Sequence, residues 1–404
     1  MILDFFSNKK LIGKSFFSIA ILMSSSISVA DDGLYFGIHR TYENPRALGM
    51  GNAIVAAVND YSALFLNPAA MARRDDGHLN MSIDIAATKS FQETFDKIEK
   101  TQQMPSSTSD EEKAKTAAML KVIQDNYGEN YSLRLTPMQG VYVNKGWGVG
   151  FIPLDSTIHL SMHNQFGPSI NAVMYSDTTL AFGVADDMQW GQHGRLSMGT
   201  TFKLINRGHF SKSMNAFEMA ENSKVIEDDD LTEGMTADVD IGMLYTPVLP
   251  TQGLFSLLRL TKPTFGLVVR NALDYGFTSD LNMYNKKEHG KPEQLYRRID
   301  VGSKWEYPDL FIFNGRGVLD FRDILHPNAT FKKTVHLGFE FDWRMASWWK
   351  GNYRIGINQG YMTLGASALL GIFNLDLVTW GEEVGTTKYP TESRTYMAKM
   401  SLDF

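Results

Sequence analysis

Alternation of apolar and polar side chains at every second residue is the feature that most constrains the fold of this chain. In residues 335–344, Val-His-Leu-Gly-Phe-Glu-Phe-Asp-Trp-Arg, every odd position is apolar and every even position is polar or glycine. Similar runs recur from residue 79 to the end of the chain, separated by Gly, Pro, Asn and Asp. Because successive side chains of a β-strand point to opposite faces, the pattern predicts strands with one apolar and one polar face.

The number of these runs favours a membrane barrel over a soluble β-sandwich, although either could give the alternation. We expect about fourteen strands, an even number as in single-chain bacterial barrels. They are predicted near residues 79–90, 135–144, 147–163, 169–186, 195–209, 236–246, 263–272, 296–306, 313–323, 332–344, 351–359, 361–370, 372–381 and 393–404. If the first strand runs outward, the long polar connections 91–134, 210–235 and 273–295 lie outside the cell.

Tryptophan positions and the last strand agree with a membrane location. All but one of the 7 tryptophans lie near strand ends assigned to the periplasmic side, as in an aromatic girdle: Trp147, Trp190, Trp305, Trp343, Trp348 and Trp349. The terminal strand places apolar side chains on one face and ends in Phe404. This ending resembles the signal by which the barrel-assembly machinery recognises outer-membrane barrels, so Tyr396 and Phe404 are candidate assembly residues. An ordinary sheet edge is the alternative.

The first thirty residues are typical of a secretory signal peptide. Lys9, Lys10 and Lys14 precede an apolar core at 16–23, and small residues lead to a predicted cleavage near Ala30. The core is shorter than the roughly 20 residues that a membrane-spanning helix needs. We therefore expect the mature chain in the cell envelope.

Composition excludes several classes of function. The chain has no Cys, which excludes a disulfide framework, a thiol nucleophile and a lipoprotein anchor. A net charge of -6 offers no concentrated basic face for nucleic acid. The nucleophile-elbow and zinc-protease motifs do not occur in the sequence. We therefore expect no enzyme, no cofactor and no metal site.

A segment before the barrel, residues 31–76, does not alternate and is expected to be a separate unit. Its glycines allow close backbone approach, an Asn-Asp pair can cap a short helix, and the residue before proline is held extended. These residues are Gly49, Gly51, Asn59, Asp60, Asn67, Pro68 and Ala69. On the residues alone, a helical arm at the periplasmic rim is an alternative to a plug.

The order of these residues within 46–72 resembles the amino-terminal hatch of the FadL family of outer-membrane transporters for long-chain fatty acids and other hydrophobic compounds. It is also similar to the PorV-like and TraF-like barrel proteins. The resemblance extends more loosely over residues 332–404. The residues between these two regions match only in pattern. It implies a plug inside a fourteen-stranded barrel, and a role for the seven residues above in folding and seating it.

A helical insertion is expected after the first strand, within residues 91–134. Ser109 with Glu112 is predicted to form a capping box, and Gly128 can end the helix. Such an insertion resembles the TraF-like branch more than the fatty-acid transporters. It could be a lid, a partner-binding helix or a packed extracellular loop.

Charged residues of both signs occupy strand positions whose side chains are expected to point into the barrel. The candidate lumen residues are Arg270, Glu340, Asp342, Arg344 and Arg354. They could form a salt-bridged interior packed on the plug, or a polar conduit that reads a carboxylate through its arginines.

Together these observations predict an all-β fold: a transmembrane antiparallel barrel of about fourteen strands with an N-terminal plug of short helices. The expected domains are 1–30, signal peptide; 31–76, plug; and 77–404, barrel. The expected function is passive uptake of hydrophobic small molecules such as long-chain fatty acids; the alternative is a non-transporting scaffold for a secretion or conjugation system. The expected partners are the outer-membrane lipid bilayer, the barrel-assembly machinery and a hydrophobic ligand, with no nucleic acid.

Replacing Phe404 with serine is predicted to lower the amount of protein assembled in the outer membrane, because it removes the terminal aromatic residue. The measurement is the amount of barrel in purified outer membranes, with Phe404→Trp as the aromatic control. Normal outer-membrane levels of the serine variant would contradict the assignment.

Overall fold

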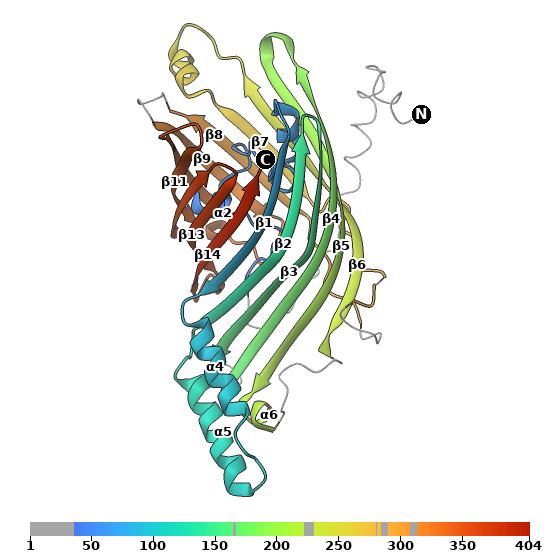
Figure 1. The fold of residues 1–404 in the computed structure, drawn as a ribbon, viewed down its shortest axis with the longest axis vertical. Helices are drawn as coiled ribbons and strands as arrows, with labels where there is room; N and C mark the ends of the chain where they lie inside the picture. The colour runs from blue at the N-terminus through green and yellow to red at the C-terminus, as the bar shows by residue number, and fades with distance from the viewer. Residues whose placement is uncertain (1–35, 165–166, 222–229, 280, 284–289, 308–312) are drawn as a thin grey trace. The chain divides into compact units, whose positions relative to one another are not determined.

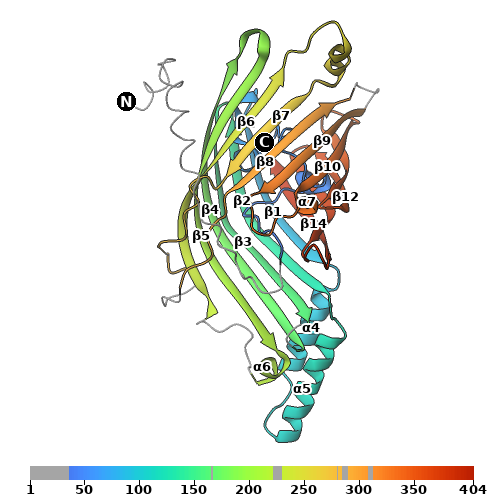
Figure 2. The same ribbon diagram turned by 180° about the vertical axis from the view of Figure 1, so that it is seen from behind.

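A computed structural model of the chain describes residues 36–164, 167–221, 230–279, 281–283, 290–307 and 313–404. The expected signal peptide, residues 1–30, lies outside the described residues. Within the unit that begins at Asp32, the chain forms a closed antiparallel barrel of fourteen strands (Figures 1 and 2).

Each strand pairs with its neighbours in sequence, and the first pairs with the last. The strands are β1 (His78–Thr88), β2 (Asn130–Asn144), β3 (Trp147–His163), β4 (Ser169–Gln189), β5 (Gly194–Asn215), β6 (Thr232–Pro247), β7 (Thr264–Arg270), β8 (Arg298–Glu306), β9 (Phe313–Ile324), β10 (Val335–Arg344), β11 (Trp349–Asn358), β12 (Tyr361–Leu370), β13 (Phe373–Glu383) and β14 (Glu392–Asp403). Every predicted segment overlaps one of them. The expected fold class is confirmed.

The barrel closes between its first and last strands. β14 runs antiparallel to β1, with Asp403 opposite Asn80 and Thr395 opposite Thr88. At the end of this ladder the backbone N–H of Leu79 donates to Phe404 O at 3.0 Å. The N–H of Phe404 donates in return to Leu79 O at 2.9 Å. A sheet closed in this way has no unpaired edge.

The barrel wall turns apolar side chains outward and polar side chains inward. On β5, Phe202 is 53% exposed, whereas its neighbours Thr201 and Lys203 are buried. Other exposed apolar residues lie around the wall: Ile83, Ile85, Phe151, Leu180, Phe182, Leu204, Ile241, Phe265, Val301, Leu319, Phe341, Tyr353, Leu364, Leu377 and Met400. We call this surface the lipid-facing belt, because it is the kind of surface that a membrane barrel presents to hydrocarbon.

The two ends of the barrel differ. At one end, which we call the helical end, β1 leads into two helices; at the other, the turn end, connections such as residues 145–146 and 371–372 are short. A segment inside the barrel connects the two ends. Near its start the N–H of Phe36 donates to Val384 O at the helical end, and near its finish Met71 O accepts from Gly146 at the turn end.

This inner segment, residues 36–76, is the plug. It contains α2 (Pro45–Gly49), α3 (Ala63–Leu66) and the 3-10 helix η3 (Pro68–Arg73). Its apolar side chains form the main hydrophobic core together with inward side chains of the wall, including Ile54, Leu64 and Met71 of the plug with Val141 and Ile152 of the wall. The core of this protein therefore lies inside the barrel, between plug and wall.

The insertion after β1 is a pair of helices, α4 (Phe91–Gln102) and α5 (Ser109–Gln124), and β2 already begins at Asn130. The expected capping box at Ser109 and Glu112 is wrong by one residue. Thr108 is the N-cap, and its side chain and that of Glu111 make the reciprocal bonds. Both pairs fit the capping spacing, and the helix starts at the earlier one because Thr108 is the residue with extended backbone.

The remaining helices are short: η4 (Gly191–His193), α6 (Ala216–Glu221), η6 (Leu254–Thr261) and α7 (Phe331–Thr334). Within the described ranges, no helix has the length and apolar composition needed to cross a membrane.

The helices α4, α5 and α6 pack on the outward face of the wall, beyond the end of β1 (Figure 1). Met119 and Ile123 of α5 are 0% exposed and share a core with Ile170 on β4 and Phe210 on β5. Because β4 and β5 pair without a bulge, Phe210 has the same outward parity as the exposed Phe202. The helices thus cover the apolar outward face where the long strands extend toward the helical end.

Replacing Met119 with alanine should weaken this packing by about 2–5 kcal/mol, the usual cost of such a truncation in a core. Limited proteolysis of the link between α4 and α5 should then be faster. The barrel itself should still migrate as the folded form in gel electrophoresis without heating. Lys113→Ala is the control, since the Lys113 side chain is 76% exposed. Equal cleavage of both variants would argue against the packing.

Candidate functional site

A polar cavity lies at the turn end, beneath the plug. Its volume is about 900 Å³. Charged and polar side chains of the plug form one side, and inward residues of β9 to β13 form the other. Of the predicted lumen residues, Glu340, Asp342, Arg344 and Arg354 line it. The plug residues Asn59 and Asp60 line it as well.

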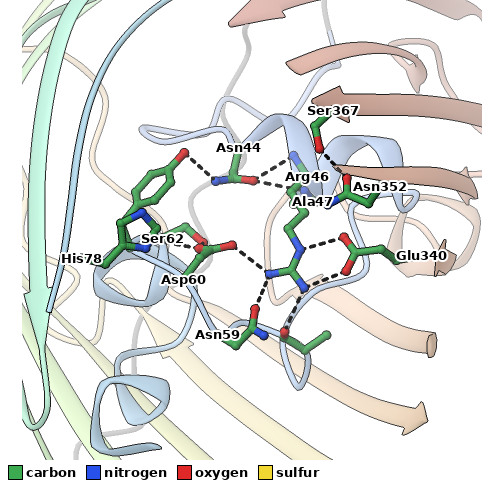
Figure 3. A network of polar contacts seen from close by, with 12 residues as sticks. Asn44, Arg46, Ala47, Asn59, Asp60, Ser62, His78, Glu340, Asn352 and Ser367 are labelled. Atoms are coloured by element: carbon green, nitrogen blue, oxygen red, sulfur yellow. Dashed lines mark hydrogen bonds and ion pairs between the residues drawn. The ribbon is translucent and has the colours of Figure 1, made fainter. Parts of the chain in front are cut away.

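One carboxylate joins the plug to the wall in this cavity. Glu340 of β10 accepts hydrogen bonds from Arg46 of α2, at 2.8 Å from Nε and 2.9 Å from Nη2 (Figure 3). It also accepts from Nε of Arg354 at 3.0 Å, and Nη1 of Arg316 lies 3.4 Å away. The Glu340 side chain is 1% exposed. We call this group, Arg46, Arg316, Glu340 and Arg354, the arginine clamp.

The other edge of the Arg46 guanidinium binds the plug itself. Its Nη1 donates to Asn59 Oδ1 at 2.6 Å and to Asp60 Oδ2 at 2.8 Å. Arg46 therefore links α2 both to the wall and to the loop before α3 (Figure 3). Burial would raise the pKa of Asp60, but the Arg46 guanidinium and the hydrogen bonds from Ser62 outweigh it and hold the pKa below its usual value.

These contacts correct one prediction. Asn59 and Asp60 were expected to cap a helix, yet α3 begins at Ala63 and its N-cap residue, Ser62, makes no side-chain cap bond. Asn59 Oδ1 and Asp60 Oδ2 accept hydrogen bonds from Arg46 instead. The capping asparagines are Asn44 for α2 and Asn67 for η3.

The clamp continues along the wall as a row of alternating charges. Arg354 donates from Nη1 to Asp376 Oδ1 at 3.0 Å and from Nη2 to Ser367 Oγ at 3.2 Å. At the other end Arg316 pairs with Asp342. Arg344, the last residue of β10, is exposed at the rim of the cavity. Because opposite charges alternate, the row is a salt-bridged interior of the kind that the sequence left open.

Arg270 lies outside this cavity and forms a second attachment of the plug. Its Nη1 and Nη2 donate to the carbonyl oxygens of Phe65 and Leu66, each at 2.7 Å. Its Nε donates to Asp300 at 2.6 Å. The last carbonyl groups of a helix lack partners within the helix, so Arg270 satisfies the end of α3 from the wall.

The plug glycines lie where its backbone touches the wall. Gly51 has φ 66°, and a Cβ there would lie 2.4 Å from the carbonyl oxygens of Ile357 and Leu337. A Cβ on Gly49 would lie 3.2 Å from the Cα of Gly365 on β12. Thr363 bridges the two plug glycines: its hydroxyl accepts from the N–H of Gly51 and donates to Gly49 O, both at 2.9 Å. Contact at this distance excludes a side chain at Gly51, and at Gly49 a side chain would require its neighbours to shift by a few tenths of an ångström.

The Asn67-Pro68-Ala69 turn contacts glycines on the opposite part of the wall. A Cβ on Gly242 would lie 2.2 Å from Asn67 Oδ1, and one on Gly199 would lie 2.5 Å from the carbonyl carbon of Pro68. Asn67 also donates to Val55 O at 2.8 Å. Of the two predicted assembly residues, Tyr396 lies on β14 and is 51% exposed, and Phe404 follows the end of β14 and is 59% exposed.

The clamp contains residues that the sequence analysis did not select, chiefly Arg46. Arg46 and Glu340 are 294 positions apart, so no local pattern joins them. A signal was present, since Arg46 stands in an apolar segment and a buried guanidinium needs a carboxylate partner. Among the described residues, no group of three or more His, Cys, Asp or Glu could hold a metal ion.

Replacing Glu340 with glutamine should loosen the plug, because it leaves buried arginine charges without their shared carboxylate, at a cost of about 3–5 kcal/mol. The chain has no Cys, so a single Val55→Cys in the plug can report exposure by its rate of maleimide labelling. The rate should rise by about tenfold or more in the glutamine variant.

Asp342→Asn is the matched control, since Asp342 pairs with Arg316 and its side chain is 33% exposed. Its labelling rate should stay near that of the parent. Equal rates in the Glu340→Gln variant and the parent would reject the clamp as an attachment that holds the plug at the turn end.

Comparison with known proteins gives a limited result. No family model matches the chain, and no curated protein matches it. Three solved structures similar to the chain are a Ralstonia pickettii toluene transporter, TbuX (9% identity, 90% of this chain and 98% of that one, TM-score 0.46); a Pseudomonas aeruginosa FadL homologue (10%, 92% and 99%, 0.42); and the Pseudomonas putida toluene transporter TodX (8%, 88% and 96%, 0.42). At these identities and TM-scores the likenesses carry no argument about the family or function of this chain.

Proposed function

We propose that the chain is an outer-membrane barrel that admits small hydrophobic molecules by passive diffusion, with the N-terminal plug controlling passage. The observation that carries the membrane location is the lipid-facing belt around a closed barrel. Trp147, Trp190, Trp348 and Trp349, all more than 40% exposed, add an aromatic girdle at the turn end. The expected signal peptide supports the same compartment.

In this proposal the helical end faces the outside of the cell and the turn end faces the periplasm. Short turns on the periplasmic side and longer extracellular connections are the usual arrangement of such barrels. Tyr396 and Phe404 then serve assembly, with Phe404 on the periplasmic side. The seven plug-motif residues fold the plug and hold it against the wall.

Because the plug lies inside the barrel, we do not interpret the protein as a permanently open pore. Ion pairs attach it to the wall at several depths: Arg40 with Asp323 at 2.6 Å near the helical end, and the arginine clamp at the turn end. Passage therefore requires the plug to shift. The clamp borders a cavity of about 900 Å³. When the plug moves, water in this cavity can therefore take the place of the lost ion-pair partners.

Hydrophobic cargo is inferred from the resemblance of residues 46–72 to the hatch of the FadL family. That family transports long-chain fatty acids and other hydrophobic compounds. Oleate, and toluene as a small hydrophobic hydrocarbon, are accordingly the first compounds to test. The proposal includes no catalytic step.

A scaffold is the second candidate, because α4 and α5 present an exposed outer surface at the helical end. Exposed residues include Phe95 at 42% and Phe217 of the adjoining α6 at 62%. As a scaffold, the chain would hold a partner of a secretion or conjugation system at this surface. Affinity purification from intact envelopes with no partner recovered, together with normal secretion after deletion, would count against it.

Uptake by cells with and without the protein tests the transport proposal. Cells that produce it should accumulate labelled oleate or toluene faster than cells with an empty vector, and a polar solute such as a disaccharide should enter equally in both. Glu340→Gln should speed hydrophobic uptake further, because a loosened plug shifts more easily, whereas Asp342→Asn should not. Uptake equal to the empty vector, with the barrel present at normal levels, would reject transport.

A further inference from the structure

An apolar groove runs across the outer surface of the barrel between β10 and β1. Its volume is about 880 Å³, within the range of roughly 300–1,000 Å³ typical of small-molecule sites. Outward side chains of six strands line it: Ile85, Ala87, Phe341, Tyr353, Ile355, Leu364, Ala366, Leu377, Thr379, Tyr396 and Ala398. The groove is thus separate from the polar cavity inside the barrel.

Strand register explains why the surface is concave here. Ala366 lies opposite Tyr353 on one side and Leu377 on the other, and Leu377 lies opposite Ala398. Ala398 in turn lies opposite Ile85 of β1. Small side chains therefore alternate with large ones along the row, so that alanines form the floor and the larger residues form the walls.

The wall beneath the groove touches the plug. Gly365 also lines the groove, next to Ala366, and its inward side meets α2: a Cβ on Gly365 would lie 3.1 Å from the Cα of Gly49. Arg354 of the clamp is the cross-strand partner of Gly365. One layer of backbone thus separates the groove from the plug.

The surroundings of the groove define its occupant. Tyr353, Leu364 and Leu377 are exposed by 56%, 51% and 50%, and they belong to the lipid-facing belt. A hollow in that belt is continuous with the membrane interface, and an unfilled apolar hollow loses dispersion contacts. Water gains too few hydrogen bonds on such a lining to stay. We propose that this groove binds one acyl chain of a membrane lipid, held against β11 to β14 over the contact between Gly365 and the plug.

Photo-cross-linking in nanodiscs tests the site. The full-length mature barrel is reconstituted with phosphatidylglycerol that carries a diazirine midway along one acyl chain, and adducts are mapped by mass spectrometry. Adducts on residues 349–403 should exceed those on the outward face of β4 to β6 several-fold. An even distribution around the belt would overturn the proposal.

Filling the floor provides the second measurement. Ala366→Phe with Ala398→Phe should abolish the excess of adducts, whereas Ala237→Phe should preserve it, since Ala237 is an exposed outward alanine on β6, opposite Leu204. Persistence of the excess in a folded, heat-resistant double variant would contradict the groove. If that variant does not fold, Ala366→Leu replaces it. The proposal depends only on contact with lipid, so a barrel without uptake can still show the excess.

Discussion

Closure of the sheet is the constraint on which the rest of this structure depends. In hydrocarbon every backbone N–H and C=O must find a partner within the protein, so a sheet that faces lipid has to end where it began. Pairing of β14 with β1 meets that requirement. It also creates an enclosed interior, and alternation then directs every second side chain into it. The polar interior, the need to fill it and the position of the plug all follow from closure.

Charges in that interior are stable because they are paired with others from a distant part of the chain. Removing a carboxylate and a guanidinium from water is costly, and their attraction offsets the cost only with good geometry and additional hydrogen bonds. Glu340 meets three arginines, and Arg46 meets two further side chains of the plug. Such attachments hold the plug in one position. The proposed function requires that water can replace them when the plug shifts.

Much of the fold could be predicted from the sequence, and less of the site. Alternation is a local signal, so the positions of the strands followed from it. Inward parity likewise identified Glu340 and Arg354. The capping pair at Asn59 and Asp60 was wrong because α3 begins at Ala63, and Arg46 takes the Asn59 oxygen and one oxygen of Asp60. Arg46 itself was missed because its partner is set by the packing of plug on wall, which no spacing in the sequence records.

The contact between Gly49 and Gly365 has a consequence for how this chain can diverge. A Cβ at either position would lie 3.1–3.2 Å from the Cα of the other residue, so it would press on the other backbone. The plug and the wall are therefore not independent modules here. In related chains a larger residue at one position would therefore require α2 or β12 to shift. A substitution inside the barrel would in this way reach a strand whose other face belongs to the lipid-facing belt.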